Sequence, residues 1–157
     1  MDILLLGIGK TTTPWIQDGL KEYEYRISRY IPLKSLYLPD LKNSKKLTTA
    51  LQKEAEGKLL LKEITDADLV VLLDERGENY TSVKFSQWLQ KSFATGKKRL
   101  VFIIGGPYGF SEEIYARANH KISLSQMTFT HEMVRLFFTE QIYRALTILR
   151  GEPYHHE

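Results

Sequence analysis

The stretch LVFIIGGPYGFSEEI, residues 100–114, is an apolar run that ends in a glycine pair, followed by a proline, a third glycine and Ser111. An uninterrupted apolar run is typical of a strand that is buried on both faces, as in a parallel sheet covered by helices. Ser111 can cap a short helix that continues to Ala118. The stretch therefore predicts a strand, a glycine-rich turn and a helix, which is the repeating unit of an α/β fold.

The rest of the chain repeats this alternation. Strands are expected at residues 2–6, 33–39, 67–77, 98–104 and 121–127, with 33–39 at a sheet edge because its apolar residues alternate with polar ones. Helices are expected between and after them, at residues 15–30, 47–64, 85–93 and 131–149. Thr13 with Pro14, and later Thr130, mark helix starts. The pattern predicts one α/β domain over residues 1–157, with a mostly parallel sheet of five to six strands and helices on both faces.

The apolar face of the 47–64 helix is expected to comprise Leu47, Leu51, Ala55, Leu59 and Ile64, which have the spacing of one helical face.

The composition limits the chemistry. The 157 residues include no cysteine, which excludes a cysteine nucleophile, a disulfide framework and a thiolate metal site, and we expect no bound metal. The N-terminal segment has neither the charged start of a signal peptide nor the length of a membrane span, so a cytoplasmic protein is expected. A net charge of +3 permits contact with nucleic acid without requiring it.

Ligands of parallel sheets collect beyond the carboxyl ends of the strands. These ends fall after Leu73, after Ile104 and after Leu124. The glycines of residues 105–109 match neither the dinucleotide fingerprint nor a phosphate-binding P-loop. They either let a ligand approach the backbone closely or only make a tight turn.

The C-terminal third carries a more specific signal. SLSQMTFTHEMVRLFFTEQIYRALTILRGEPYHHE (residues 123–157), with LLDERG (72–77) and IIGGPYGF (103–110) before it, resembles the RlmH-type ribosomal RNA large subunit methyltransferases of the SPOUT class. The resemblance implies S-adenosylmethionine-dependent methylation of N3 of a pseudouridine in 23S ribosomal RNA on the assembled ribosome. The rival interpretations are a SPOUT methyltransferase for another RNA position and a catalytically silent SPOUT protein that binds the ribosome.

Carried over by residue, the resemblance implies a cofactor site at the same three strand ends. It comprises Leu73, Gly105, Leu124, Ser125, Gln126, Met127, Thr128 and Phe129. Apolar side chains there can sandwich the adenine ring while backbone groups bind its edge.

The resemblance further implies a deep C-terminal trefoil knot and a homodimer whose active sites use both chains. The general rule against knots predicts an ordinary open sheet, so the knot rests on the resemblance alone. Phe137 and Phe138 are adjacent on a helix and point in different directions, so one can face the core and the other a partner.

Methyl transfer to N3 requires a nitrogen-bound proton to leave. His155 and Tyr154 in the tail are the catalytic candidates, and Asp74 is another possible base, although a solvated tail and a loop hydrogen bond explain them equally simply. Arg135 is a further candidate, because an arginine at a helix start can hold an anion. His131 and Arg144 are candidates for RNA binding. Arg144 can also form an ordinary helix-surface pair with Glu140.

Overall fold

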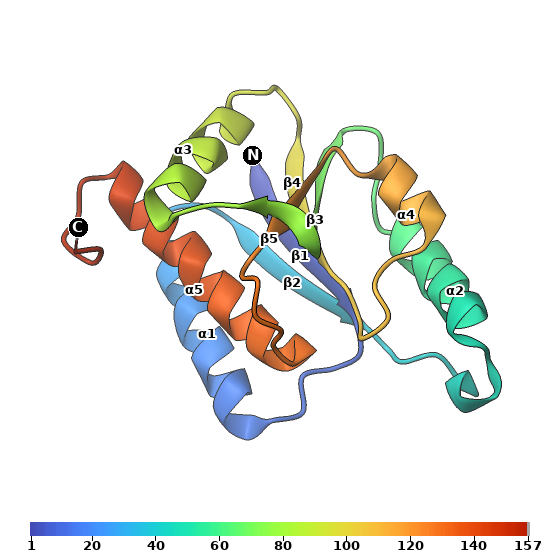
Figure 1. Ribbon diagram of the computed structural model, residues 1–157. Helices are drawn as coiled ribbons and strands as arrows, with labels where there is room; N and C mark the ends of the chain where they lie inside the picture. Colours follow the sequence, from blue (N-terminus) through green and yellow to red (C-terminus); the bar gives the residue numbers. More distant parts are fainter. Residues whose placement is uncertain (157) are drawn as a thin grey trace.

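The computed structural model describes residues 1–156 and contains one five-stranded, entirely parallel sheet. Its strands are β1 (Asp2–Ile8), β2 (Leu33–Leu38), β3 (Asp68–Asn79), β4 (Arg99–Ile104) and β5 (His120–Ser123). Their order across the sheet is β2-β1-β4-β3-β5 (Figure 1). The predicted parallel sheet is confirmed, and 33–39 forms an edge strand as expected.

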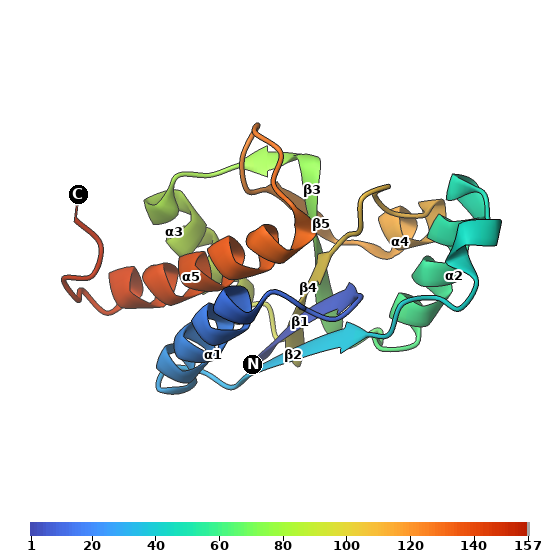
Figure 2. The same cartoon turned by 90° about the horizontal axis from the view of Figure 1, so that it is seen from below.

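Helices cover both faces of the sheet, as the sequence predicted. On one face lie α1 (Pro14–Ser28), α3 (Ser82–Phe93) and α5 (His131–Leu149), and on the other lie α2 (Thr49–Leu61) and α4 (Glu112–Arg117) (Figures 1 and 2). A single turn of 3-10 helix, η1 (Ser44–Lys46), precedes α2.

The central strands are apolar throughout because each contributes to two cores. Successive side chains of a strand point to opposite faces. The core beneath α1, α3 and α5 contains Ile3, Leu5, Leu100, Phe102 and Ile104, whereas the core beneath α2 and α4 contains Leu4, Leu6, Val101 and Ile103. The apolar run of residues 100–104 in β4 is continuous for this reason.

Hydroxyl side chains begin most of the helices. The side chains of Thr48, Thr81, Ser111 and Thr130 each accept a hydrogen bond from the backbone N–H three residues further on. At α1 only Pro14 acts as predicted, because the Thr13 side chain forms no capping bond.

The expected apolar face of the 47–64 helix was wrong at its start, although Ile64 packs against the core as expected. Leu47 and Leu51 are exposed, and the buried residues of α2 are Gly57 and Leu60. Gly57 is needed because a Cβ there would collide with Ser111 of the neighbouring α4 segment. A glycine contributes nothing to an apolar pattern. The spacing of apolar residues therefore could not predict which face of α2 contacts the sheet and α4.

Strands β3 and β5 end differently from the prediction. β5 stops at Ser123, and the residues up to Thr130 form a loop, whereas β3 continues to Asn79 through a register shift against β5. Gly77 permits this, since a Cβ there would lie 2.6 Å from the backbone of Ile122. The loop after Ser123 thereby becomes available as a binding segment.

Within residues 1–156, no helix has the length and apolar character to cross a membrane.

Candidate functional site

The direction in which the chain leaves the strands creates a crevice at their carboxyl ends. From β1 and β3 the chain passes to α1 and α3 on one face, and from β4 it passes to α4 on the other (Figure 1). Ligands of parallel sheets bind where neighbouring strands diverge in this way. A cleft of about 1010 Å³ lies there, lined by the ends of β3 and β4, residues 105–110, residues 123–125 and 127–134, and the start of α1.

The cleft gathers nearly all of the residues expected to bind the cofactor. Leu73, Gly105, Leu124, Ser125, Met127, Thr128 and Phe129 line it, whereas Gln126 is exposed and lies outside the lining. His131, a candidate for RNA binding, also lines it. Three strand ends that are far apart in sequence therefore meet in one cavity.

Residues 105–110, here called the glycine turn, form one wall of the cleft. A Cβ on Gly105 would lie 2.9 Å from the ring of Phe110, which is buried in the core. At Gly106 the nearest atom to an added Cβ is a carboxylate oxygen of Glu56 at 3.7 Å. Gly105 is therefore required by packing, whereas Gly106 leaves bare backbone beside the cleft.

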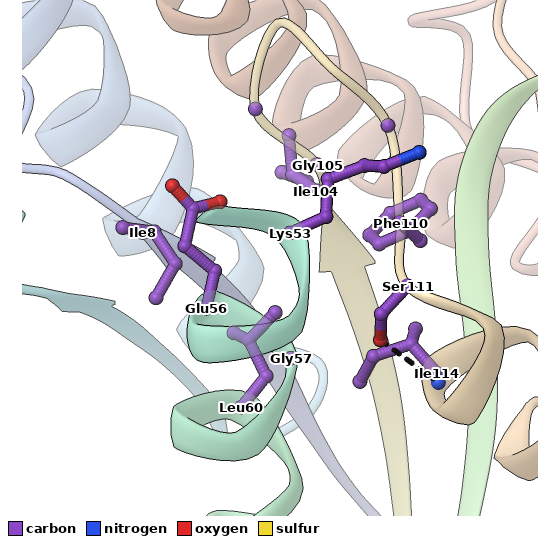
Figure 3. A pocket seen from close by; sticks show the side chains of 12 residues that line it. Ile8, Lys53, Glu56, Gly57, Leu60, Ile104, Gly105, Phe110, Ser111 and Ile114 are labelled. Carbon is purple, nitrogen blue, oxygen red and sulfur yellow. Dashed lines mark hydrogen bonds between the residues drawn. The ribbon is translucent and has the colours of Figure 1, made fainter. Parts of the chain in front are cut away.

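The glycine turn rests on α2. Figure 3 shows Lys53 extending from α2 toward the turn and Glu56 extending on the side of Ile8, and the Ser111 side chain accepts a hydrogen bond from the Ile114 N–H at 3.3 Å. The gap between α2 and the turn measures about 10 Å³, enough for one water molecule at most. The glycine turn therefore packs on α2, and the space between them is too small to bind a second ligand.

The opposite wall is the loop of residues 124–129. The Ser123 hydroxyl donates to the Ser125 carbonyl at 3.0 Å, and the Met127 N–H donates to the Ser125 hydroxyl at 3.0 Å. Within residues 1–156, the backbone N–H groups of Gln126, Thr128 and Phe129 donate to no protein acceptor. Met127 is 76% exposed despite its apolar side chain. Free amides beside an apolar side chain suit a flat heteroaromatic ligand.

Asp74 at the end of β3 is already engaged within the cleft wall. Its carboxylate accepts hydrogen bonds from the Tyr115 hydroxyl and from the Arg76 N–H, the latter at 2.8 Å. Burial, followed by the bond to Asp74, raises the pKa of Tyr115 to about 12, so the phenol keeps its proton. These contacts fit a structural role for Asp74.

Arg135 lies beneath the cleft rather than in it. It is only 1% exposed, and its guanidinium donates to the Thr11 hydroxyl and the Ile8 carbonyl, both at 2.9 Å. The same group lies 3.8 Å from the centre of the Tyr37 ring, and burial lowers its pKa. Arg135 therefore joins α5 to the loop after β1.

The tail packs against α1 and α5. The Tyr154 hydroxyl donates to Glu140 at 3.0 Å and lies 3.4 Å from the Tyr23 hydroxyl. Arg144 donates to Glu140 at 2.6 Å and lies 3.1 Å from Nδ1 of His155. Burial and these hydrogen bonds raise the pKa of Tyr154 above its ordinary value, so it is a neutral phenol at physiological pH. The catalytic candidates Tyr154 and His155 thus meet Arg144, but none of the three lines the cleft of the same chain.

A smaller cavity of about 360 Å³ lies between α3 and α5. Its lining includes Phe129 and Phe137, whose ring centroids are 5.2 Å apart. Phe138 is buried in the core while Phe137 is 39% exposed, so the two neighbours do point to different environments.

The family model for the predicted SPOUT methyltransferases matches residues 1–155. The chain belongs to the SPOUT methyltransferase family. It is 54% identical over 157 residues to a protein of Parabacteroides distasonis and 50% identical over 157 residues to one of Porphyromonas gingivalis, each covering 100% of both chains. Both relatives are named ribosomal RNA large subunit methyltransferase H.

The SPOUT assignment agrees with a solved structure. A probable methylase family protein from Haemophilus influenzae matches 99% of this chain and 70% of its own length, with a TM-score of 0.55 and 10% sequence identity. At this identity the match supports the fold alone.

Sequence reasoning missed several residues that line the cleft of this SPOUT methyltransferase. They are Trp15, Tyr108, Tyr115 and Glu132. Trp15 and Glu132 are 117 residues apart in the chain (132 − 15), so no local pattern joins them. An exposed tryptophan directly after a helix-starting proline was the one available signal.

Proposed function

We propose that this chain is a ribosomal RNA large subunit methyltransferase that uses S-adenosylmethionine to methylate N3 of a pseudouridine in 23S ribosomal RNA on the assembled ribosome. The proposal rests on one observation above all. The cofactor residues inferred from the resemblance, with the exception of Gln126, line one cleft at the carboxyl ends of β3, β4 and β5. Relatives that match along the whole chain are named ribosomal RNA large subunit methyltransferase H, which supports methylation of the large-subunit ribosomal RNA.

The residues of the cleft fit the proposed cofactor. Leu73 and Met127 offer apolar surfaces to an adenine ring, and the free amides of the 124–129 loop can donate to its edge. Gly106 leaves the backbone of the glycine turn accessible to the rest of the molecule. When bound, S-adenosylmethionine supplies an electrophilic methyl group on a positively charged sulfur.

The protein must orient N3 of the base, accept its proton and exclude water while the charge moves. We assign the orienting role to Tyr154 and Arg144, because Tyr154 is a neutral phenol and Arg144 is a fixed cation. His155 is the proton acceptor in this scheme once Arg144 leaves its Nδ1 atom to hold the RNA, because the Arg144 N–H otherwise occupies the only lone pair of a neutral imidazole. We assign Arg135 a positioning role instead of a direct one, because its guanidinium is buried among protein groups.

The tail and the cleft of one chain lie apart, which supports the homodimer implied by the resemblance. We propose that the tail of one protomer completes the cleft of its partner. The half-exposed Phe137, beside Phe129, offers an apolar surface for the contact. The trefoil knot and the cytoplasmic location, where ribosomes are assembled, remain parts of the same proposal.

The test is methyl transfer from labelled S-adenosylmethionine into ribosomes that lack the modification, with free ribosomal RNA alongside. Label at N3 of one pseudouridine, dependent on the assembled ribosome, is the expected result. Label at a different nucleotide would contradict the target, and cofactor binding without label would favour a silent ribosome-binding protein. Label in free RNA as efficient as in ribosomes would contradict the requirement for assembly.

A further inference from the structure

We propose that Trp15 is a stacking platform for a base of the RNA substrate at the mouth of the cleft. This inference rests on the proposed function and adds a substrate-binding residue to it. Trp15 belongs to the first turn of α1, directly after Pro14, and lines the cleft together with residues of the 124–129 loop.

The exposure of Trp15 has no explanation within the folded chain. The indole residue is 60% exposed, whereas tryptophan is normally among the most buried residues on average. The residues through which α1 packs on the sheet are Ile16, Leu20 and Ile27. Trp15 therefore contributes little to the core, and its ring is available to a ligand.

The segment that leads into α1, directly before Pro14 and Trp15, is held in place by the start of α5. The Glu132 carboxylate accepts hydrogen bonds from the N–H groups of Thr12 at 2.8 Å and Thr13 at 3.0 Å, and from the Thr12 hydroxyl at 3.2 Å. Arg135, one turn further along α5, donates to Thr11 at 2.9 Å. An exposed loop with this many bonds to a single distant helix is fixed before a ligand arrives, which lowers the entropic cost of binding.

The cleft has room for more than a cofactor. Pockets for small molecules and cofactors measure roughly 300–1,000 Å³, and this cleft lies at the upper end with about 1010 Å³. The predicted cofactor residues lie at the ends of β3, β4 and β5, whereas Trp15 lies in the first turn of α1, which follows β1. The space beside Trp15 is therefore left for the second reactant.

Stacking is the interaction by which proteins hold unpaired RNA bases. Bases that are unstacked from a loop pack on aromatic side chains, and removing one such side chain typically weakens binding by one to two orders of magnitude. A planar, exposed indole at the fixed start of α1, at the entrance of a methyl-transfer cleft, has the chemistry for that contact.

The test compares Trp15→Ala and Trp15→Phe with Tyr25→Ala in steady-state methylation of ribosomes. Tyr25 is the matched control, since it lies on the same helix, is 63% exposed and does not line the cleft. We expect Trp15→Ala to raise the KM for ribosomes about tenfold. Trp15→Phe should keep the KM for ribosomes close to the wild-type value, and Tyr25→Ala should leave it unchanged. The affinity for S-adenosylhomocysteine, measured calorimetrically, should be the same in all variants.

Three results would overturn the inference. They are an unchanged ribosome KM in Trp15→Ala, an equal effect of Tyr25→Ala, and a parallel loss of affinity for S-adenosylhomocysteine, which would make Trp15 a cofactor contact. Methyl transfer by the wild-type chain shows whether the stacking role alone or the proposed function as a whole has failed. No transfer by the wild type overturns both, whereas normal wild-type transfer with any of the three results overturns only the stacking platform.

Discussion

Replacing Arg135 should distinguish a residue that contacts the reacting groups from one that only positions the loop after β1. Replacing it with alanine removes two hydrogen bonds from a charged donor, to the Thr11 hydroxyl and to the Ile8 carbonyl. Each such bond contributes about 1.5–3 kcal/mol to stability. The free energy that burial costs the guanidinium, which is visible in its lowered pKa, is recovered in the variant and offsets part of the loss. We expect Arg135→Ala to lower the free energy of unfolding by about 3 kcal/mol.

Urea unfolding followed by tryptophan fluorescence measures this effect. At a typical slope of about 2 kcal/mol per molar urea, the midpoint should fall by about 1.5 M. All variants should be compared at one protein concentration, because association would add to the apparent stability. Arg135→Lys is the matched control, since a lysine keeps the charge but cannot present the same planar fork, and it should lose an intermediate amount.

A positioning role for Arg135 also predicts how methyl transfer should change in Arg135→Ala. If Arg135 positions the loop after β1, transfer should fall in proportion to the loss of order in that loop, and the affinity for S-adenosylhomocysteine should fall by less. An Arg135→Ala variant of unchanged urea midpoint that has lost all transfer would refute the positioning role. The guanidinium would then act on a reacting group.

Three further expectations follow from the contacts. Gly105→Val should lower the free energy of unfolding by about 1–3 kcal/mol, because its side chain would overpack against the buried Phe110 ring, and Gly106→Ala should cost much less; urea midpoints of both variants check this. Burial opposes ionisation of Asp68, but hydrogen bonds from Arg99 and Thr65 outweigh it and lower the pKa. The stability from this pair is therefore complete above about pH 5, clear of the pKa of the unfolded chain, and it is lost as the pH falls through the folded pKa. Asp68→Asn should flatten that part of the pH profile of urea midpoints. Tyr154→Phe should lower kcat for ribosomes with little change in cofactor affinity, as single-turnover assays can measure.

The sheet and the three strand ends were predictable because their signals are local. Strand β4 packs into two cores and is therefore apolar at every position, and the glycine turn follows it directly. The 124–129 loop was expected to bind the cofactor from the resemblance, although sequence pattern alone assigned most of it to a strand. Secondary structure at that point is decided by the glycine-mediated contact between β3 and β5.

The remaining features depend on contacts between distant segments. An arginine near a helix start is ordinarily exposed, so the burial of Arg135 against Tyr37 could not be inferred from its neighbours in the chain. The same holds for Glu132, whose role depends on the loop after β1 arriving beside α5. The tail gave a short polar signal typical of mobility, yet Tyr154 packs on Tyr143 with ring centroids 4.7 Å apart.

The central claim is that the cleft at the carboxyl ends of β3, β4 and β5 holds the methyl donor. A crystal structure with S-adenosylhomocysteine tests it most directly. The account predicts that the ligand lies between Gly105 and the 124–129 loop, with its adenine against Leu73 or Met127. Binding instead in the cavity between α3 and α5, beside Phe137, would contradict the account.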